Sequence, residues 1–181
     1  KGLKVTLLSN GLLWTESMIK ELAPLIDEIQ FSIDGANEKT NAAVRGKDNF
    51  DRVVETVIKF SNYGVKTSVS TTFTYENLEN DIHIKYKEFM RAVKSRTTNE
   101  VFFKLSKKLL PGRDVNISVE ENEKYSKRIK EIEQFVNKNA DYENFIVGHS
   151  PNLIAVNCGL GGISIGADGS VYFCNRIYEV E

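Results

Sequence analysis

Four short apolar segments that alternate with helical patterns restrict the fold of this chain more than any other feature. Strands that alternate with helices are typical of βα units, in which the strands lie parallel in one sheet. The sequence therefore predicts an α/β fold: a partial (β/α) barrel of about four parallel strands, followed by a helix and a small β-hairpin. The predicted strands are residues 3–9, 28–34, 65–74 and 100–106.

Helical patterns separate and follow these strands. Residues 49–62 give the clearest one, because their apolar side chains recur at helical spacing and form one stripe. Thr15 is a predicted cap for a shorter helix, and residues 76–96 are predicted to be a charged helix. Ser118 and Glu121 match the Ser-x-x-Glu capping box that begins a helix.

The pattern changes after Ala140. Residues 161–175 alternate in polarity around Ala-Asp-Gly-Ser, which predicts a hairpin of two short strands. Pro111 and Gly112 break the chain between the last predicted strand of the sheet and the following helix. We therefore divide the chain into residues 1–112 and residues 113–181.

The predicted strands have one apolar face and one polar face. A parallel sheet that helices cover on both sides is normally apolar throughout. The polar face therefore indicates either a curved sheet that lines a water-filled cavity or strands that face solvent on one side. The pattern alone does not distinguish between these two arrangements. In the second strand the apolar face holds Ile29, Phe31 and Ile33, and the polar face holds Gln30, Ser32 and Asp34.

Charge and composition narrow the classes of function. A formal net charge of −1 gives no electrostatic case for a nucleic-acid or anionic membrane partner. No apolar run approaches the roughly 18 residues that cross a bilayer, and no secretory leader is visible. The chain opens on Lys1 and enters a predicted strand at once, which indicates a piece of a longer protein.

Two polar stretches fall where ligands bind in such folds, at the carboxyl ends of the strands. These are Ser9-Asn10-Gly11 and Ser32-Ile33-Asp34-Gly35. Ser32 and Asp34 could bind hydroxyls or a charged group, and Arg45 could pair with a carboxylate. Alternatively, both stretches are turns, Asn37 caps a helix and Arg45 is a surface charge.

Three stretches resemble the middle of the radical S-adenosylmethionine (radical SAM) enzymes. They are "LLSNG", "QFSIDGANEKTNAAVRG" and "NFDRVVETVIKFSNYGVKTSVSTTFTYEN". In the peptide-modifying branch of that family, one strand tends to end Thr-Asn-Gly and the next Ser-x-Asp-Gly, with Arg-Gly about a dozen residues later. Ser9 replaces the threonine of the first motif.

The two cysteines extend the resemblance. Cys158, ten residues, Gly169, four residues and Cys174 match the opening of the SPASM extension, which binds auxiliary iron–sulfur clusters. The family's Cys-x3-Cys-x2-Cys loop, its Gly-Gly-Glu-like element and the later SPASM cysteines are missing. By resemblance, residues 1–112 are strands three to six of the parent barrel, and residues 113–181 are a linker helix and the start of SPASM.

The resemblance implies a function for the parent enzyme. A reduced cluster cleaves S-adenosylmethionine to a 5′-deoxyadenosyl radical, which modifies a peptide or protein in the cytoplasm. Cofactor-binding residues would be Ser9, Asn10, Ser32, Asp34 and Arg45, with Ser32 and Arg45 at the ribose and the carboxylate. Cys158 and Cys174 would ligate an auxiliary [4Fe–4S] cluster. We expect this piece alone to be inactive, to contain no catalytic residue and to hold no cofactor or intact cluster.

Three alternatives remain open. Lys104 could form a Schiff base as in barrel aldolases, or the chain could be a non-catalytic peptide-binding module. The cysteines could also be small buried side chains or the remnant of a zinc site. His83 and His149 are predicted to have surface or loop roles, and the oligomeric state does not follow from the sequence.

Overall fold

The computed structural model describes residues 2–107, 118–137, 145–147, 164–166 and 168–172. The chain divides into two compact units, residues 1–148 and 149–181. We describe each unit by itself. No helix in the described ranges has the length and apolar character needed to cross a bilayer.

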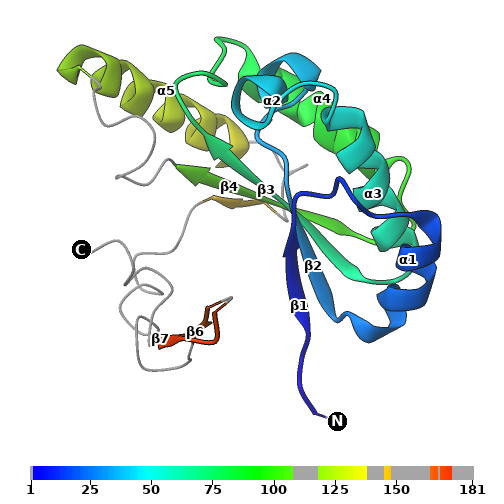
Figure 1. Ribbon diagram of the computed structural model, residues 1–181. Helices are drawn as coiled ribbons and strands as arrows, with labels where there is room; N and C mark the ends of the chain where they lie inside the picture. The colour runs from blue at the N-terminus through cyan, green and yellow to red at the C-terminus, as the bar shows by residue number, and fades with distance from the viewer. Residues whose placement is uncertain (1, 108–117, 138–144, 148–163, 167, 173–181) are drawn as a thin grey trace. The chain divides into compact units, whose positions relative to one another are not determined.

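The first unit is built on a parallel sheet (Figure 1). Its strands follow the order of the sequence, and the four predicted strands are confirmed. A fifth strand pairs parallel with β4. It has only three residues, so the sequence contains no alternating polar and apolar pattern long enough to predict it. The strands are β1 (Thr6–Ser9), β2 (Glu28–Ser32), β3 (Lys66–Phe73), β4 (Val101–Lys107) and β5 (Phe145–Val147).

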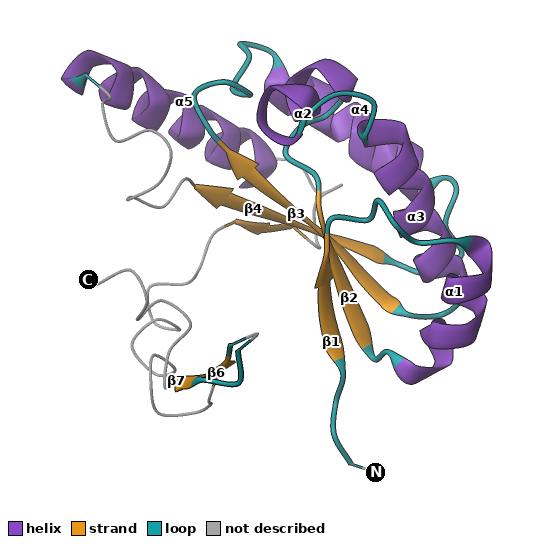
Figure 2. Cartoon of the chain, in the orientation of Figure 1, coloured by secondary structure: helices purple, strands orange, loops and turns teal. Residues whose placement is uncertain are grey.

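The helices of the first unit lie on one face of this sheet (Figure 2). Their ends follow the predicted caps: the Thr15 hydroxyl accepts a hydrogen bond from Met18 N, and Ser118 and Glu121 form the capping box. The helices are α1 (Glu16–Leu22), the 3-10 helix η1 (Ala23–Leu25), α2 (Glu38–Arg45), α3 (Phe50–Asn62), α4 (Ile82–Lys94) and α5 (Val119–Asn137).

The helix predicted from residue 76 begins only at Ile82. The reason is Asn77, a buried side chain that holds the preceding segment in a turn. Its Oδ1 accepts a hydrogen bond from Thr74 N at 2.7 Å, and its Nδ2 donates to Thr72 O at 2.8 Å. The first residues of the predicted helix are therefore a loop at the carboxyl end of β3.

The two predicted strand faces are confirmed. Ile29, Phe31 and Ile33 are buried against the helices, as are Val69 and Phe73 of β3. The polar side chains of the same strands are half-buried on the opposite face. They include Gln30, Ser32, Ser68, Ser70 and Thr72.

The described part of the second unit is a hairpin. Strands β6 (Ser164–Ile165) and β7 (Val171–Tyr172) pair antiparallel, as predicted. Gly166 N donates to Ser170 O at 2.7 Å and closes the turn. Cys158 and Cys174 lie outside the described residues, so their role stays a prediction. The division at residue 112 also stays a prediction, and helix α5 and strand β5 belong to the first unit.

Candidate functional site

A cavity of about 410 Å³ lies at the carboxyl ends of β1 and β2. Its volume is in the range of small-molecule sites. Four of the five predicted cofactor-binding residues line it, namely Asn10, Ser32, Asp34 and Arg45. The other lining residues are Leu12, Asn41, Val44, Asn49 and Val53.

Ser9 does not line the cavity. The strand register pairs Ser9 with Phe31, which places its side chain on the face that the helices cover. Its hydroxyl accepts hydrogen bonds from Gly11 N at 3.0 Å and from Trp14 Nε1 at 2.9 Å. Trp14 in turn packs edge-on against Phe60 of α3. In this structure Ser9 therefore stabilises the turn after β1.

Asp34 is a buried carboxylate that joins four segments. Its Oδ2 lies 2.6 Å from Arg45 Nε, and its Oδ1 accepts a hydrogen bond from Thr72 N at 2.7 Å. Its backbone N donates to Asn41 Oδ1 at 3.0 Å, and its backbone O accepts from Asn77 Nδ2 at 2.6 Å. Burial raises the pKa of Asp34, although the Thr72 N–H and the Arg45 guanidinium both act to lower it.

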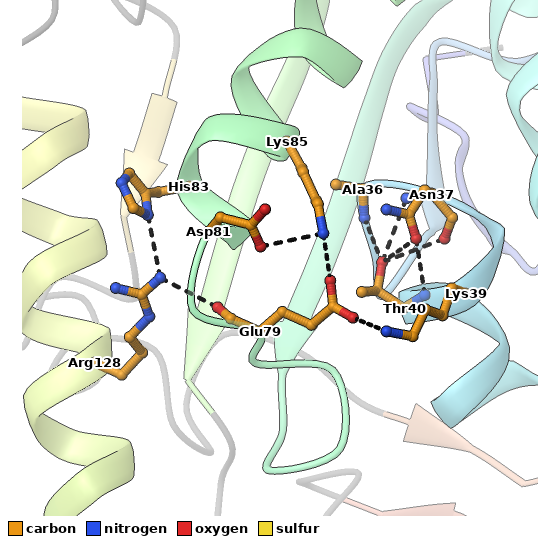
Figure 3. Close-up of polar contacts among 9 residues, drawn as sticks. All are labelled: Ala36, Asn37, Lys39, Thr40, Glu79, Asp81, His83, Lys85 and Arg128. Atoms are coloured by element: carbon orange, nitrogen blue, oxygen red, sulfur yellow. Dashed lines mark hydrogen bonds and ion pairs between the residues drawn. The ribbon is translucent and has the colours of Figure 1, made fainter.

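The turn after Asp34 fixes the start of α2. Asn37 and Thr40 form a reciprocal capping box, and the Thr40 hydroxyl also accepts a hydrogen bond from Ala36 N (Figure 3). Asn37 is thus a helix cap, as the alternative hypothesis predicted. A Cβ at Gly35 would clash with the backbone N of Asn41, so only glycine fits this approach.

Arg45 is the last residue of α2, and 33 % of its side chain is exposed. The ion pair with Asp34 uses Nε, so the two terminal nitrogens have no protein partner in the described part of the chain. The Ser32 hydroxyl likewise has no protein partner there. Arg45 is therefore more than a surface charge, and the cavity has a cation and a hydroxyl that remain available to a ligand.

A second set of charges joins the loop before α4 to its neighbours (Figure 3). Glu79 accepts hydrogen bonds from Lys39 of α2 and Lys85 of α4, and these two cations hold the pKa of Glu79 below its ordinary value. Arg128 of α5 donates to Glu79 O at 3.2 Å and lies 3.3 Å from His83 Nδ1. These contacts hold α2, α4 and α5 around the loop.

His83 does not line the cavity. His83 is half-buried in the first turn of α4, where its ring packs edge-on against Phe135. Burial and the nearby Arg128 guanidinium lower its pKa. His149 lies outside the described residues. Within the described ranges, no group of three His, Cys, Asp or Glu side chains is placed to hold a metal ion.

The buried amides that hold Asp34 were not predicted from the sequence. Asn41 and Asn77 are 2 % and 0 % exposed, yet each lies in a polar stretch that is typical of a surface. The spacing of Asn41 four residues after the cap Asn37 was a usable signal, because that spacing puts both on one side of α2. No local signal marks Asn77, which lies 43 residues from its partner Asp34.

Lys104 lies in the middle of β4, within the predicted strand. Its Nζ donates a hydrogen bond to Gln30 Oε1 at 3.0 Å across the polar face of the sheet. Its proposed reactivity as a Schiff-base lysine stays a prediction, which borohydride trapping would test.

Comparisons with known proteins agree with the fold. Residues 1–86 match the family model of the radical SAM superfamily. Mycofactocin maturase MftC of Mycolicibacterium smegmatis is 36% identical over 73 residues, which cover 39% of this chain and 19% of that protein.

Two solved structures share the fold of the chain. SuiB of Streptococcus suis bound to S-adenosylmethionine superposes with a TM-score of 0.60 and 16% identity, over 99% of this chain and 44% of that one. AnSMEcpe with bound AdoMet and the Kp18Cys peptide gives a TM-score of 0.64 and 21% identity, over 95% of this chain and 51% of that one. The chain thus spans about half of each structure, and the predicted partial α/β barrel is confirmed.

We predict that Gly35→Ala destabilises the protein far more than Gly64→Ala. The new Cβ at position 35 meets backbone that the capping box fixes, and we expect a loss of about 3 kcal/mol or more. Gly64 has a φ of +85°, and no heavy atom lies within 4 Å of where its Cβ would be, so its replacement should cost roughly 1–2 kcal/mol. Urea unfolding measures both, and equal losses would contradict the close approach at Gly35.

We also predict that Arg45→Gln destabilises the protein increasingly as the pH rises through the raised pKa of Asp34. The variant removes a charge that lowers the raised pKa of Asp34, so ionising the buried carboxylate becomes more costly in the folded state. At neutral pH we expect a loss of about 1–3 kcal/mol, reduced because Arg45 is partly exposed. Lys47→Gln, which removes an exposed neighbouring charge, is the control. A loss that does not depend on pH would show that the ion pair is not its cause.

Proposed function

Since residues 1–86 match the radical SAM superfamily, we propose that the chain is the central part of an enzyme that reductively cleaves S-adenosylmethionine to modify a peptide or protein. The observation that carries this proposal is the pairing of Arg45 with the buried carboxylate of Asp34 at 2.6 Å, beside Ser32 in the cavity. It leaves two guanidinium nitrogens and a hydroxyl for a ligand at the carboxyl edge of the sheet, where ligands bind in such folds.

The residues of the cavity fit this cofactor. S-adenosylmethionine carries a carboxylate, which suits the fork of guanidinium donors on Arg45, and a ribose, whose hydroxyls suit Ser32. Asp34 would orient Arg45, and the amide of Asn10 adds a further polar group at the same mouth. The cofactor supplies radical chemistry when it is cleaved, and these residues bind and orient it.

The relatives support a peptide or protein as the second substrate. SuiB has been crystallised with its precursor peptide SuiA, and anSMEcpe with the Kp18Cys peptide. MftC is named a maturase. We extend the same substrate class to the enzyme that contains this chain.

The remaining parts of the proposal concern residues outside the described ranges. We propose that Cys158 and Cys174 ligate an auxiliary [4Fe–4S] cluster in a SPASM extension that begins after the linker helix. Two cysteines are fewer than the usual four thiolates, so further ligands would come from elsewhere in the longer protein. A reducing cytoplasm suits such clusters.

We predict that Arg45→Gln weakens S-adenosylmethionine binding by the full-length protein about tenfold to a hundredfold. A charge-assisted contact contributes roughly 1.5–3 kcal/mol, whereas the neutral hydroxyl contact that Ser32→Ala removes contributes only about 0.5–1.5 kcal/mol. Ser32→Ala should therefore weaken binding by about tenfold or less. Titration with the cofactor measures both, at a temperature where each variant is folded.

The control for this titration is Lys47→Gln, which removes an exposed charge two residues after Arg45. Iron content should not change in any variant, because none of these residues is a proposed cluster ligand. Unchanged cofactor affinity in folded Arg45→Gln would show that the Asp34–Arg45 pair only shapes the turn.

A further inference from the structure

The polar face of the sheet carries a positive charge near its centre. Lys104 lies in the middle of β4 and is half-buried, and its one hydrogen bond in the described residues goes to a neutral acceptor, Gln30 Oε1. The charges at the amino end of this face behave differently. There Glu28 pairs with Lys66 at 2.6 Å and with Lys4 at 2.9 Å, so each of these lysines has a carboxylate partner.

Lys104 lies level with the proposed cofactor site. The strand register places Ser32, Ser70 and Lys104 in one row across β2, β3 and β4. Neighbouring strands are about 4.8 Å apart, so the backbones of Ser32 and Lys104 are roughly 9–10 Å apart. A substrate that reacts beside the cofactor would therefore lie on the same face of the sheet as Lys104.

We propose that Lys104 binds a carboxylate of the peptide substrate, either an acidic side chain or the terminal carboxylate. An ammonium has three donors, and Gln30 uses one of them. A carboxylate would neutralise the Lys104 ammonium, and the hydrogen bond between them would be charge-assisted because Lys104 is partly removed from solvent. The hydroxyls of Ser68 and Ser70, which have no protein partner among the described residues, can bind the peptide backbone beside it.

This inference rests on the proposed function, because it takes the cavity at Ser32 as the cofactor site.

The test compares short peptide libraries on the full-length protein with S-adenosylmethionine present. All randomised positions exclude Asp and Glu. One library has a central Glu and an amidated end, the second a central Gln and an amidated end, and the third a central Gln and a free carboxyl end. Fluorescence anisotropy should show that wild type prefers one carboxylate library to the neutral one by about tenfold or more.

Lys104→Gln should remove this preference, and Lys20→Gln, which removes an exposed charge from α1, should retain it. The carboxylate library that wild type prefers and Lys104→Gln does not prefer identifies the source of the carboxylate, either the acidic side chain or the free carboxyl end. Equal preferences in wild type and Lys104→Gln, or no carboxylate preference in wild type, would overturn the inference. The affinity for S-adenosylmethionine separates the two proposals. If the wild-type protein does not bind the cofactor, the proposed function is wrong. If it binds the cofactor but shows no preference for a carboxylate peptide, only the role of Lys104 is wrong.

Discussion

The carboxylate of Asp34, buried just after β2 and paired with Arg45, makes the interaction on which the site depends. Removing such a charge from water is costly unless hydrogen bonds and an opposite charge compensate it. Here the compensation comes from Thr72 N on β3 and from Arg45 Nε on α2. Because these groups are on different elements, the carboxylate fixes the end of α2 relative to the sheet. The same contacts leave the outer edge of the Arg45 guanidinium available to a ligand, so the burial of one charge orients another toward the cavity.

Features that depend on local periodicity could be predicted from the sequence. The strands, their two faces and the caps at Thr15 and Ser118 were correct, because alternation and capping act over a few residues. Strand β5 and the late start of α4 could not be predicted, because they depend on pairing with β4 and on the buried amide of Asn77. Such contacts join residues that are far apart in the chain, and no short pattern encodes them.

The site was predictable in the same partial way. Strand alternation placed Asp34 on the polar face with Ser32, and both residues line the cavity although β2 itself ends at Ser32. The burial of Asp34 was not predicted, because it depends on Asn41 and Asn77, which hold its backbone. Ser9 shows the opposite effect, since it lies within β1 and its register with Phe31 turns it toward the helices. Residue type and position at a strand end located the cavity, and only the tertiary register decides which side chains reach it.

The polar face of the sheet follows from these constraints. At its amino end Glu28 is a carboxylate partner for both Lys4 and Lys66, and at its carboxyl end Arg45 pairs with Asp34. Between them lie hydroxyls, Gln30 and the ammonium of Lys104. A half-buried cation without a counter-charge lowers stability relative to a neutral side chain of similar size. Among the described residues Lys104 has no carboxylate partner, unlike Lys66 and Arg45, so its setting is better suited to receiving an anionic group than to stability alone.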